Sequence, residues 1–181
     1  MTRRPFPHVL LVLGLSLAVA TPVRGQELPR VVVLATGGTI ASTYDEATGA
    51  LRAALTGEEI VAAVEGLSEL ARVSVEQIAN VNSRDMTPAI WLQLAARANA
   101  LLAESDVAGV VVTHGTDTLE ETAYFLDLTV ESDKPIVVVG AQRAPTMADT
   151  DGPRNMLNAV RSEEHTSELQ SPCNLVCRLL L

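Results

Sequence analysis

Aromatic residues are scarce in this 181-residue chain: they make up 3% of it, with one Trp, two Tyr and two Phe. A core with so few rings must be built from Val, Leu, Ile and Ala, which suits a buried parallel sheet whose strands are apolar on both faces. Basic residues are also few, since 13 Lys and Arg stand against 22 Asp and Glu and give a formal net charge of -9. A general nucleic-acid binder needs clustered basic residues to neutralise phosphates, so the composition argues against that class and favours a protein that handles small molecules.

Cysteine is nearly absent as well, because both cysteines, Cys173 and Cys177, fall within the last nine residues. No disulfide can therefore link parts of the remaining chain. A metal site formed by these thiols and His165 is disfavoured, because a fourth ligand at zinc-like spacing is missing.

The N-terminal residues 1–25 have the three-part layout of a secretory signal: basic Arg3 and Arg4, an apolar run from Val9 to Ala20, and small residues before the polar sequence. A membrane helix needs about 20 apolar residues to cross about 30 Å of hydrocarbon, so this run is too short to be an anchor. We expect cleavage near Gly25 and a periplasmic or secreted protein.

The C-terminal residues 161–181 do not continue the pattern that precedes them, because their apolar residues follow neither a helical nor a strand period. The peptide from Arg161 to Ser171 resembles the in-frame translation of a sequencing-library adapter. We therefore expect this tail to be non-native, with a genuine variable C-terminus as the alternative. Residues 26–160 then form one domain.

Apolar runs and amphipathic stripes alternate through this domain. The runs predict strands at 30–35, 73–78, 107–113 and 136–139, and the stripes predict helices at 57–66, 88–105, 118–130 and 154–160. Thr56 with Glu59, and Thr118 with Glu121, have the spacing of capping boxes at two of the helix starts. The order predicts an α/β fold: an open, mainly parallel sheet with helices on both faces.

Polar loops follow the four expected strands, at the sheet edge where α/β proteins bind ligands. They lie at 36–39, 82–85, 114–117 and 141–143. Gly37 and Gly38 match no nucleotide-binding fingerprint. A glycine turn flanked by threonines instead suits a nucleophilic hydroxyl with backbone N–H groups nearby for an oxyanion. We expect His114, at the end of the third strand, to be a hydrogen-bonded core residue.

Two stretches resemble signatures of the bacterial-type asparaginases, which convert L-asparagine to L-aspartate and ammonia and in some members also accept glutamine. The stretches are ATGGTIA at 35–41 and THGTDTLEETA at 113–123. Residues 134–160 also follow the family pattern, so the resemblance covers about residues 28–160. It implies the Rossmann-like N-terminal domain of that family, and the export signal resembles that of the periplasmic type.

The resemblance also implies roles for individual residues. Thr39 is then the nucleophile and Thr116 the second catalytic threonine, Asp117 holds the substrate's α-amino group, Ser83 binds its α-carboxylate, and a backbone N–H of the Gly38 turn helps to stabilise the oxyanion. No metal or organic cofactor is implied. The implied partner is a small-molecule substrate, without nucleic acid and without a membrane after signal cleavage, and the implied full-length form is a homotetramer.

The sequence departs from the family pattern at three places. The loop after the nucleophile has no tyrosine at 49–53, so Tyr44 is the candidate for the family's catalytic tyrosine. Arg84 stands where family members often have a neutral amide, so it either faces the substrate's ammonium group or turns out to solvent. The family's lysine and a further acidic residue fall beyond residue 160, so we expect the 181-residue chain itself to be inactive.

Two other functions remain open. One is a non-catalytic periplasmic module that binds an amino acid at the same strand ends. The other is an asparaginase-like subunit that liberates ammonia from glutamine. The preference between asparagine and glutamine does not follow from the sequence.

Overall fold

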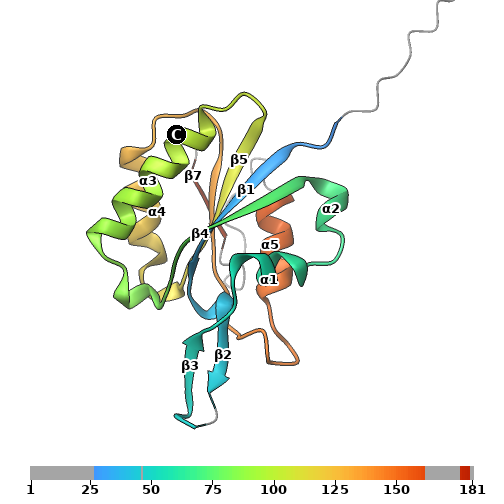
Figure 1. The fold of residues 1–181 in the computed structure, drawn as a ribbon, viewed down its shortest axis with the longest axis vertical. Coiled ribbons are helices and arrows are strands. Elements are labelled where there is room, and N and C mark those ends of the chain that lie inside the picture. Colours follow the sequence, from blue (N-terminus) through green and yellow to red (C-terminus); the bar gives the residue numbers. More distant parts are fainter. Residues whose placement is uncertain (1–26, 46, 162–175, 180–181) are drawn as a thin grey trace, which may run out of the picture.

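A five-stranded sheet forms the centre of the computed structural model, which describes residues 27–45, 47–161 and 176–179 (Figure 1). The strands follow the order β4-β1-β5-β6-β7. They are β1 (Arg30–Gly37), β4 (Arg72–Val81), β5 (Val107–Thr113), β6 (Ile136–Val139) and β7 (Val176–Leu179). The first four strands pair in parallel, and β7 pairs with β6 in the antiparallel direction. The expected signal, His165 and Cys173 lie outside the described residues.

Helices cover both faces of this sheet, as the alternating pattern predicts (Figure 1). One face carries α3 (Pro88–Leu102) and α4 (Leu119–Thr129), and the other carries α1 (Gly57–Ala62), α2 (Leu67–Leu70) and α5 (Gly152–Arg161). The α/β fold with a mainly parallel, doubly covered sheet is therefore confirmed. In the part of the chain described here, no helix is long and apolar enough to cross a membrane.

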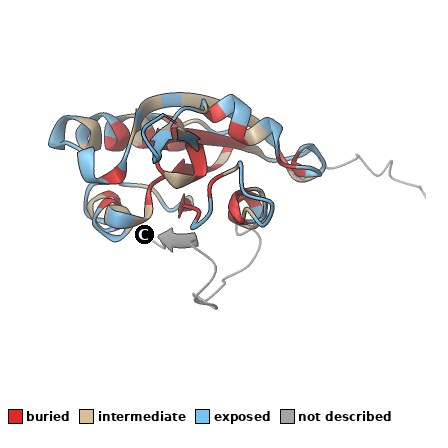
Figure 2. Ribbon diagram, turned by 90° about the horizontal axis from the view of Figure 1, so that it is seen from below, coloured by how far each residue is buried: buried red, intermediate tan, exposed pale blue. Residues whose placement is uncertain are grey.

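The central strand β1 explains why its sequence reads as an uninterrupted apolar run. Val31 and Val33 pack with the α1 and α5 side, whereas Val32 and Leu34 pack with the α3 and α4 side. Val33 lies between Val75 of β4 and Val111 of β5 in the register. Figure 2 shows the buried residues gathered in the sheet between its two helical layers. A strand buried on both faces has no polar alternation.

Several expected helix boundaries and one expected capping box differ from the structure, since α3 ends at Leu102 rather than 105 and α5 begins at Gly152 rather than 154. The helix predicted at 57–66 ends at Ala62, and Gly66, with φ of 76°, starts the separate short helix α2. Thr56 and Glu59 do form a complete capping box. The second capping box is wrong, because the Thr118 side chain makes no cap hydrogen bond and instead donates to the Ser83 carbonyl at 2.8 Å.

Three strands were not expected from the sequence. β2 (Ser42–Asp45) and β3 (Ala50–Ala53) form an antiparallel hairpin that projects from the sheet edge after β1 (Figure 1). The third is β7, which lies in the C-terminal tail. Residues of the hairpin border a cleft at the carboxyl end of the sheet.

Candidate active site

Three loops meet at the carboxyl end of the sheet and form a cleft of about 340 Å³. Each loop continues into a short 3-10 turn: Thr39–Ala41 after β1, Ser83–Asp85 after β4 and Thr116–Thr118 after β5. The cleft is lined by Gly38 and Thr39, by residues 82–84 and 115–117, and by Ser42, Ala50 and Leu51. The structure thus brings together every candidate site residue from the sequence except Tyr44.

Glycines allow these loops to touch through their backbones. A Cβ atom on Gly38 would lie 2.3 Å from the Gly115 backbone nitrogen, and a Cβ atom on Gly115 would lie 2.6 Å from the Ser83 hydroxyl oxygen. Real Cβ atoms do not approach other atoms this closely. Gly38 also has φ of 83°, a conformation that glycine adopts without the usual steric penalty. Gly38 and Gly115 therefore fix how near the three loops can come.

Thr39 starts the first 3-10 turn, is half-buried and lines the cleft. Among the described residues, neither its hydroxyl nor that of Thr116 has a hydrogen-bond partner. The N–H of Gly38 donates to the Val81 carbonyl at 3.0 Å, so this group is not available to an oxyanion. The N–H of Thr39 has no such backbone partner in the same part of the chain. If the turn holds an oxyanion, its donor is therefore Thr39 rather than Gly38.

Ser83 is buried beside the third loop and is oriented by it. Its hydroxyl oxygen accepts the Asp117 backbone N–H at 3.2 Å, and its carbonyl accepts the Thr118 hydroxyl at 2.8 Å. A serine hydroxyl has one proton to donate, and neither of these bonds uses that proton. Ser83 can therefore donate to a carboxylate that enters the cleft.

Arg84 and Asp117 are the charged residues among those that line the cleft. The Arg84 Nε atom lies 3.0 Å from Asp117 Oδ2, and the side chains are 78% and 53% exposed. The sequence left two placements open for Arg84: facing the substrate's ammonium group, or turned out to solvent. The structure combines features of both. The side chain is solvent-exposed, yet it holds the carboxylate that was expected to receive the substrate's ammonium group.

His114 directly precedes Gly115 of the cleft lining and is fully buried. Its Nδ1 is 2.7 Å from the Gly115 carbonyl and its Nε2 is 2.8 Å from the Thr122 hydroxyl, which also accepts the Trp91 indole N–H at 2.8 Å. Since a carbonyl only accepts, Nδ1 carries the proton and Nε2 accepts from Thr122. Burial lowers the pKa of His114 and outweighs the Gly115 hydrogen bond, which favours the charged form. The expectation of a hydrogen-bonded core histidine is confirmed.

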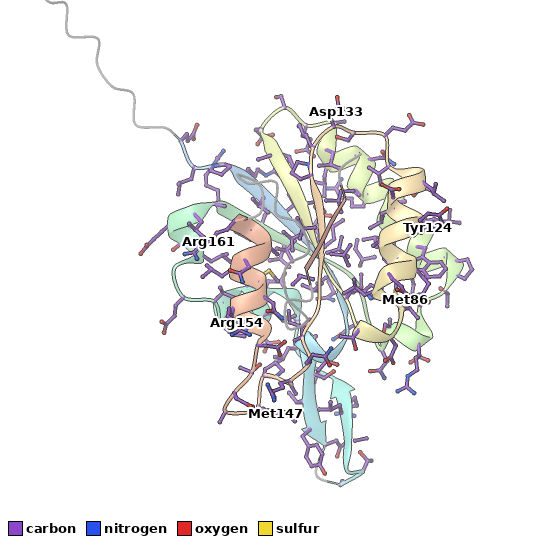
Figure 3. The ribbon with its side chains drawn as sticks, turned by 180° about the vertical axis from the view of Figure 1, so that it is seen from behind. Met86, Tyr124, Asp133, Met147, Arg154 and Arg161 are labelled. Carbon is purple, nitrogen blue, oxygen red and sulfur yellow. The ribbon has the colours of Figure 1, made fainter. Side chains whose placement is uncertain are left out.

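The fourth loop does not line the cleft, contrary to the expectation that four loops converge there. The Asp151 carboxylate accepts the backbone N–H groups of Gln142 and Arg143 and the side-chain amide of Asn155. These bonds hold the loop against the start of α5 instead. Burial alone would raise the pKa of Asp151, but the hydrogen bonds together lower it. Figure 3 shows Met147 at the outer end of this loop and Arg154 on α5.

Tyr44 lies on β2 of the hairpin and is 55% exposed. It does not line the cleft, although Leu51, directly opposite it in the hairpin register, does. Opposite residues of an antiparallel pair share one face, so Tyr44 belongs to the same face of the hairpin as Leu51. Its catalytic role stays a prediction.

The sequence did not identify Ser42, Ala50, Leu51 or Asn82 as cleft residues. The first three come from the unexpected hairpin and its entry, whose residues carry no strand pattern. Asn82 stood within an expected polar loop, but nothing set it apart there. In the described part of the chain, no group of three or more His, Cys, Asp or Glu side chains is placed to hold a metal ion.

Known proteins are similar to this chain in sequence and in fold. The family described as Asparaginase, N-terminal, matches residues 30–174. L-asparaginase 2 of Bacillus subtilis (strain 168) is 52% identical over 139 residues, which cover 75% of this chain and 37% of that protein. L-asparaginase 2 of Escherichia coli (strain K12) is 48% identical over 152 residues, which cover 83% of this chain and 41% of that protein.

A solved structure gives the same result for the fold. The probable cytoplasmic L-asparaginase from Campylobacter jejuni superposes with a TM-score of 0.68 at 46% identity, over 76% of this chain and 40% of that one. The chain thus spans about two fifths of the length of the relatives that it matches.

Proposed function

Because the chain belongs to the asparaginase family, we propose that in the full-length protein this cleft hydrolyses the side-chain amide of L-asparagine to L-aspartate and ammonia. The observation that carries this proposal is the convergence of both signature stretches on one cleft, with the hydroxyls of Thr39 and Thr116 free at its wall. A relative from Pseudomonas fluorescens biotype A, 44% identical over 158 residues, is named glutaminase-asparaginase. We therefore include L-glutamine as a second substrate.

The proposed reaction proceeds in two steps. The Thr39 hydroxyl oxygen attacks the side-chain amide carbon, the bond from that carbon to nitrogen breaks, and ammonia leaves with the hydroxyl proton. Water then hydrolyses the aspartyl ester, which releases L-aspartate and restores the threonine. The Thr39 backbone N–H has no backbone acceptor among the described residues, and we assign it the stabilisation of the oxyanion in the tetrahedral intermediates.

Two residues orient the α-substituents of the substrate in this proposal. The Ser83 hydroxyl donates to the α-carboxylate, since its oxygen already accepts the Asp117 N–H. The Asp117 carboxylate receives the α-ammonium group in a charge-assisted hydrogen bond, which is stronger than a neutral one. Thr116 directly precedes Asp117 in the chain segment that lines the cleft, and we assign it the second catalytic hydroxyl.

A covalent probe tests the nucleophile without requiring turnover. The purified 181-residue chain is incubated with an asparagine analogue whose side-chain amide is replaced by a diazomethyl ketone, and the labelled residue is located by mass spectrometry. We expect one label, on Thr39, and slower labelling in the presence of excess L-asparagine. Thr39→Ala removes the label, whereas Thr43→Ala, on the adjoining hairpin and outside the cleft lining, keeps it.

The same experiment separates the alternatives. Asparagine binding without any label on the chain would favour the non-catalytic binding module and overturn the proposed chemistry. A label at another residue, or labelling that asparagine does not slow, would overturn Thr39 as the nucleophile. Ammonia release by the purified chain would contradict the expectation that it is inactive.

Location and assembly are further parts of the proposal. The relatives' names differ in compartment, since one is a probable periplasmic L-asparaginase of Haemophilus influenzae and another is called cytoplasmic. The layout of residues 1–25 supports export for this protein. We retain the homotetramer for the full-length form, and sedimentation velocity of that form tests it, since a monomer would contradict it.

A further inference from the structure

The ammonium-binding group of the proposed site already has a cationic partner in the free protein. Asp117 receives the substrate's ammonium in the proposed function, yet its Oδ2 atom lies 3.0 Å from Arg84 Nε. We propose that Arg84 is a specificity-determining residue: by pairing with Asp117, it shifts the cleft toward ω-amide carboxylic acids that lack an α-ammonium group. This inference rests on the proposed function of the same cleft.

Arg84 and the substrate's ammonium group compete for one carboxylate. An ammonium group at Asp117 must displace the Arg84 guanidinium or share the carboxylate with it at close range. Displacement forfeits the existing ion pair, and sharing places two positive charges side by side. Either route weakens the binding of a zwitterionic amino acid relative to a cleft in which Asp117 is unpaired.

The carboxylate end of the ligand experiences the opposite effect. Ser83, which offers its hydroxyl proton, is adjacent to Arg84 in the chain, and its hydroxyl oxygen is bonded to the backbone of Asp117. Arg84 compensates the negative charge of Asp117, so an incoming carboxylate meets a cleft without net charge from its lining side chains. Succinamate, which is asparagine without the amino group, keeps the amide and the carboxylate and avoids the competition.

The size of the effect follows from the exposure of the pair. The two side chains are 78% and 53% exposed, so solvent screens their interaction. Exposed ion pairs change equilibrium constants by no more than about five-fold. We therefore expect Arg84 to alter the ratio of the two dissociation constants by about two- to five-fold at low ionic strength, and by less at high salt.

The experiment measures the binding of L-asparagine and of succinamate to the 181-residue chain by titration calorimetry. Arg84→Gln should tighten asparagine about two- to five-fold and leave succinamate unchanged or weaker. Arg143→Gln is the matched control, because Arg143 Nε lies 3.1 Å from Asp149 Oδ2 in a similarly exposed pair outside the cleft lining. An unchanged ratio in Arg84→Gln, or weaker asparagine binding, overturns the inference.

A second variant tests whether the effect passes through Asp117. In an Asp117→Asn background, Arg84→Gln should no longer improve asparagine binding, since no carboxylate remains to compete for. An improvement of the same size in that background overturns the inference. If the unsubstituted chain binds neither asparagine nor succinamate, the proposed function is overturned as well. If it binds asparagine and Arg84→Gln leaves that binding unchanged, this inference alone is overturned.

Discussion

Gly38→Ala is the substitution that most directly tests how the cleft is built. The added Cβ atom would lie 2.3 Å from the Gly115 nitrogen, 2.4 Å from the Gly115 Cα and 2.6 Å from the His114 carbonyl carbon. All three are backbone atoms, so no side chain can rotate away to make room. Either the loop after β1 or the loop after β5 must move, and both carry proposed catalytic threonines.

Two costs add in this variant. Gly38 has φ of 83° and ψ of -172°, a region that is essentially restricted to glycine and costs another residue about 1–3 kcal/mol. Forcing a methyl group into a packed site costs about 1–3 kcal/mol more. We therefore expect Gly38→Ala to lower the free energy of unfolding by about 2–6 kcal/mol, a large part of the about 5–15 kcal/mol typical of a domain.

Gly66→Ala is the control that separates backbone strain at a positive φ from the steric clash of an added Cβ atom. Gly66 has φ of 76°, and its added Cβ atom would meet nothing within 4 Å, so only a left-handed penalty of about 1–2 kcal/mol applies. Urea unfolding of both variants measures how much free energy of unfolding each one loses. If Gly66→Ala folds and Gly38→Ala does not, the loss in Gly38→Ala is at the upper end of the expected range. Equal losses in the two variants would refute the claim that backbone contact between the loops limits this site.

Two further predictions concern the fourth loop and the N-terminus. Asp151→Asn should lower the free energy of unfolding at pH 7 by about 1–3 kcal/mol, because two part-buried backbone N–H groups and the buried Asn155 amide lose a charged acceptor. The pKa of Asp151 lies below its ordinary value of 3.8 in the folded protein, so its stabilisation is present above that value and is lost as the pH falls through the folded pKa. Urea unfolding of the unsubstituted protein and of Asp151→Asn should show that their difference in free energy of unfolding shrinks as the pH falls below the folded pKa. A difference that does not change with pH would exclude this role of the Asp151 carboxylate. A reporter fused after Gly25 should be exported, and its retention in the cytoplasm would exclude the expected signal.

The strands β1, β5 and β6 were predictable because they are buried on both faces. The run at 107–113 matches β5 without error, since seven consecutive residues with almost no polar side chain leave few alternatives. The helix after it was predicted for a reason that is only partly correct. Leu119–Thr129 is helical, but the Thr118 hydroxyl, which was expected to cap it, bonds to Ser83 across the cleft. A capping pattern cannot reveal a partner that is 35 residues away in the chain.

The hairpin and the fourth loop were not predictable for a similar reason. Residues 42–53 have no apolar alternation, and their pairing follows from the path of the chain between β1 and α1 rather than from strand propensity. The position of residues 141–143 depends on Asp151, whose carboxylate draws the loop away from the cleft. Both features are set by contacts between segments, which a pattern along one segment does not contain.

Hydrogen bonding divides the many hydroxyls at this sheet edge into two groups, and this division bears on the choice of nucleophile. Thr36 donates to the Thr113 carbonyl at 2.6 Å, Ser42 to the Gly38 carbonyl at 2.8 Å, and Thr118 to the Ser83 carbonyl. A hydroxyl proton already given to a carbonyl is not available for removal by a base, so these residues join the loops rather than react. Thr39 keeps its proton free beside a backbone N–H without a backbone acceptor in the described part of the chain. Thr116 and Ser83 also keep a hydroxyl proton free, so the hydrogen bonds narrow the candidates in the cleft to three hydroxyls, and Thr39 as the nucleophile stays a prediction.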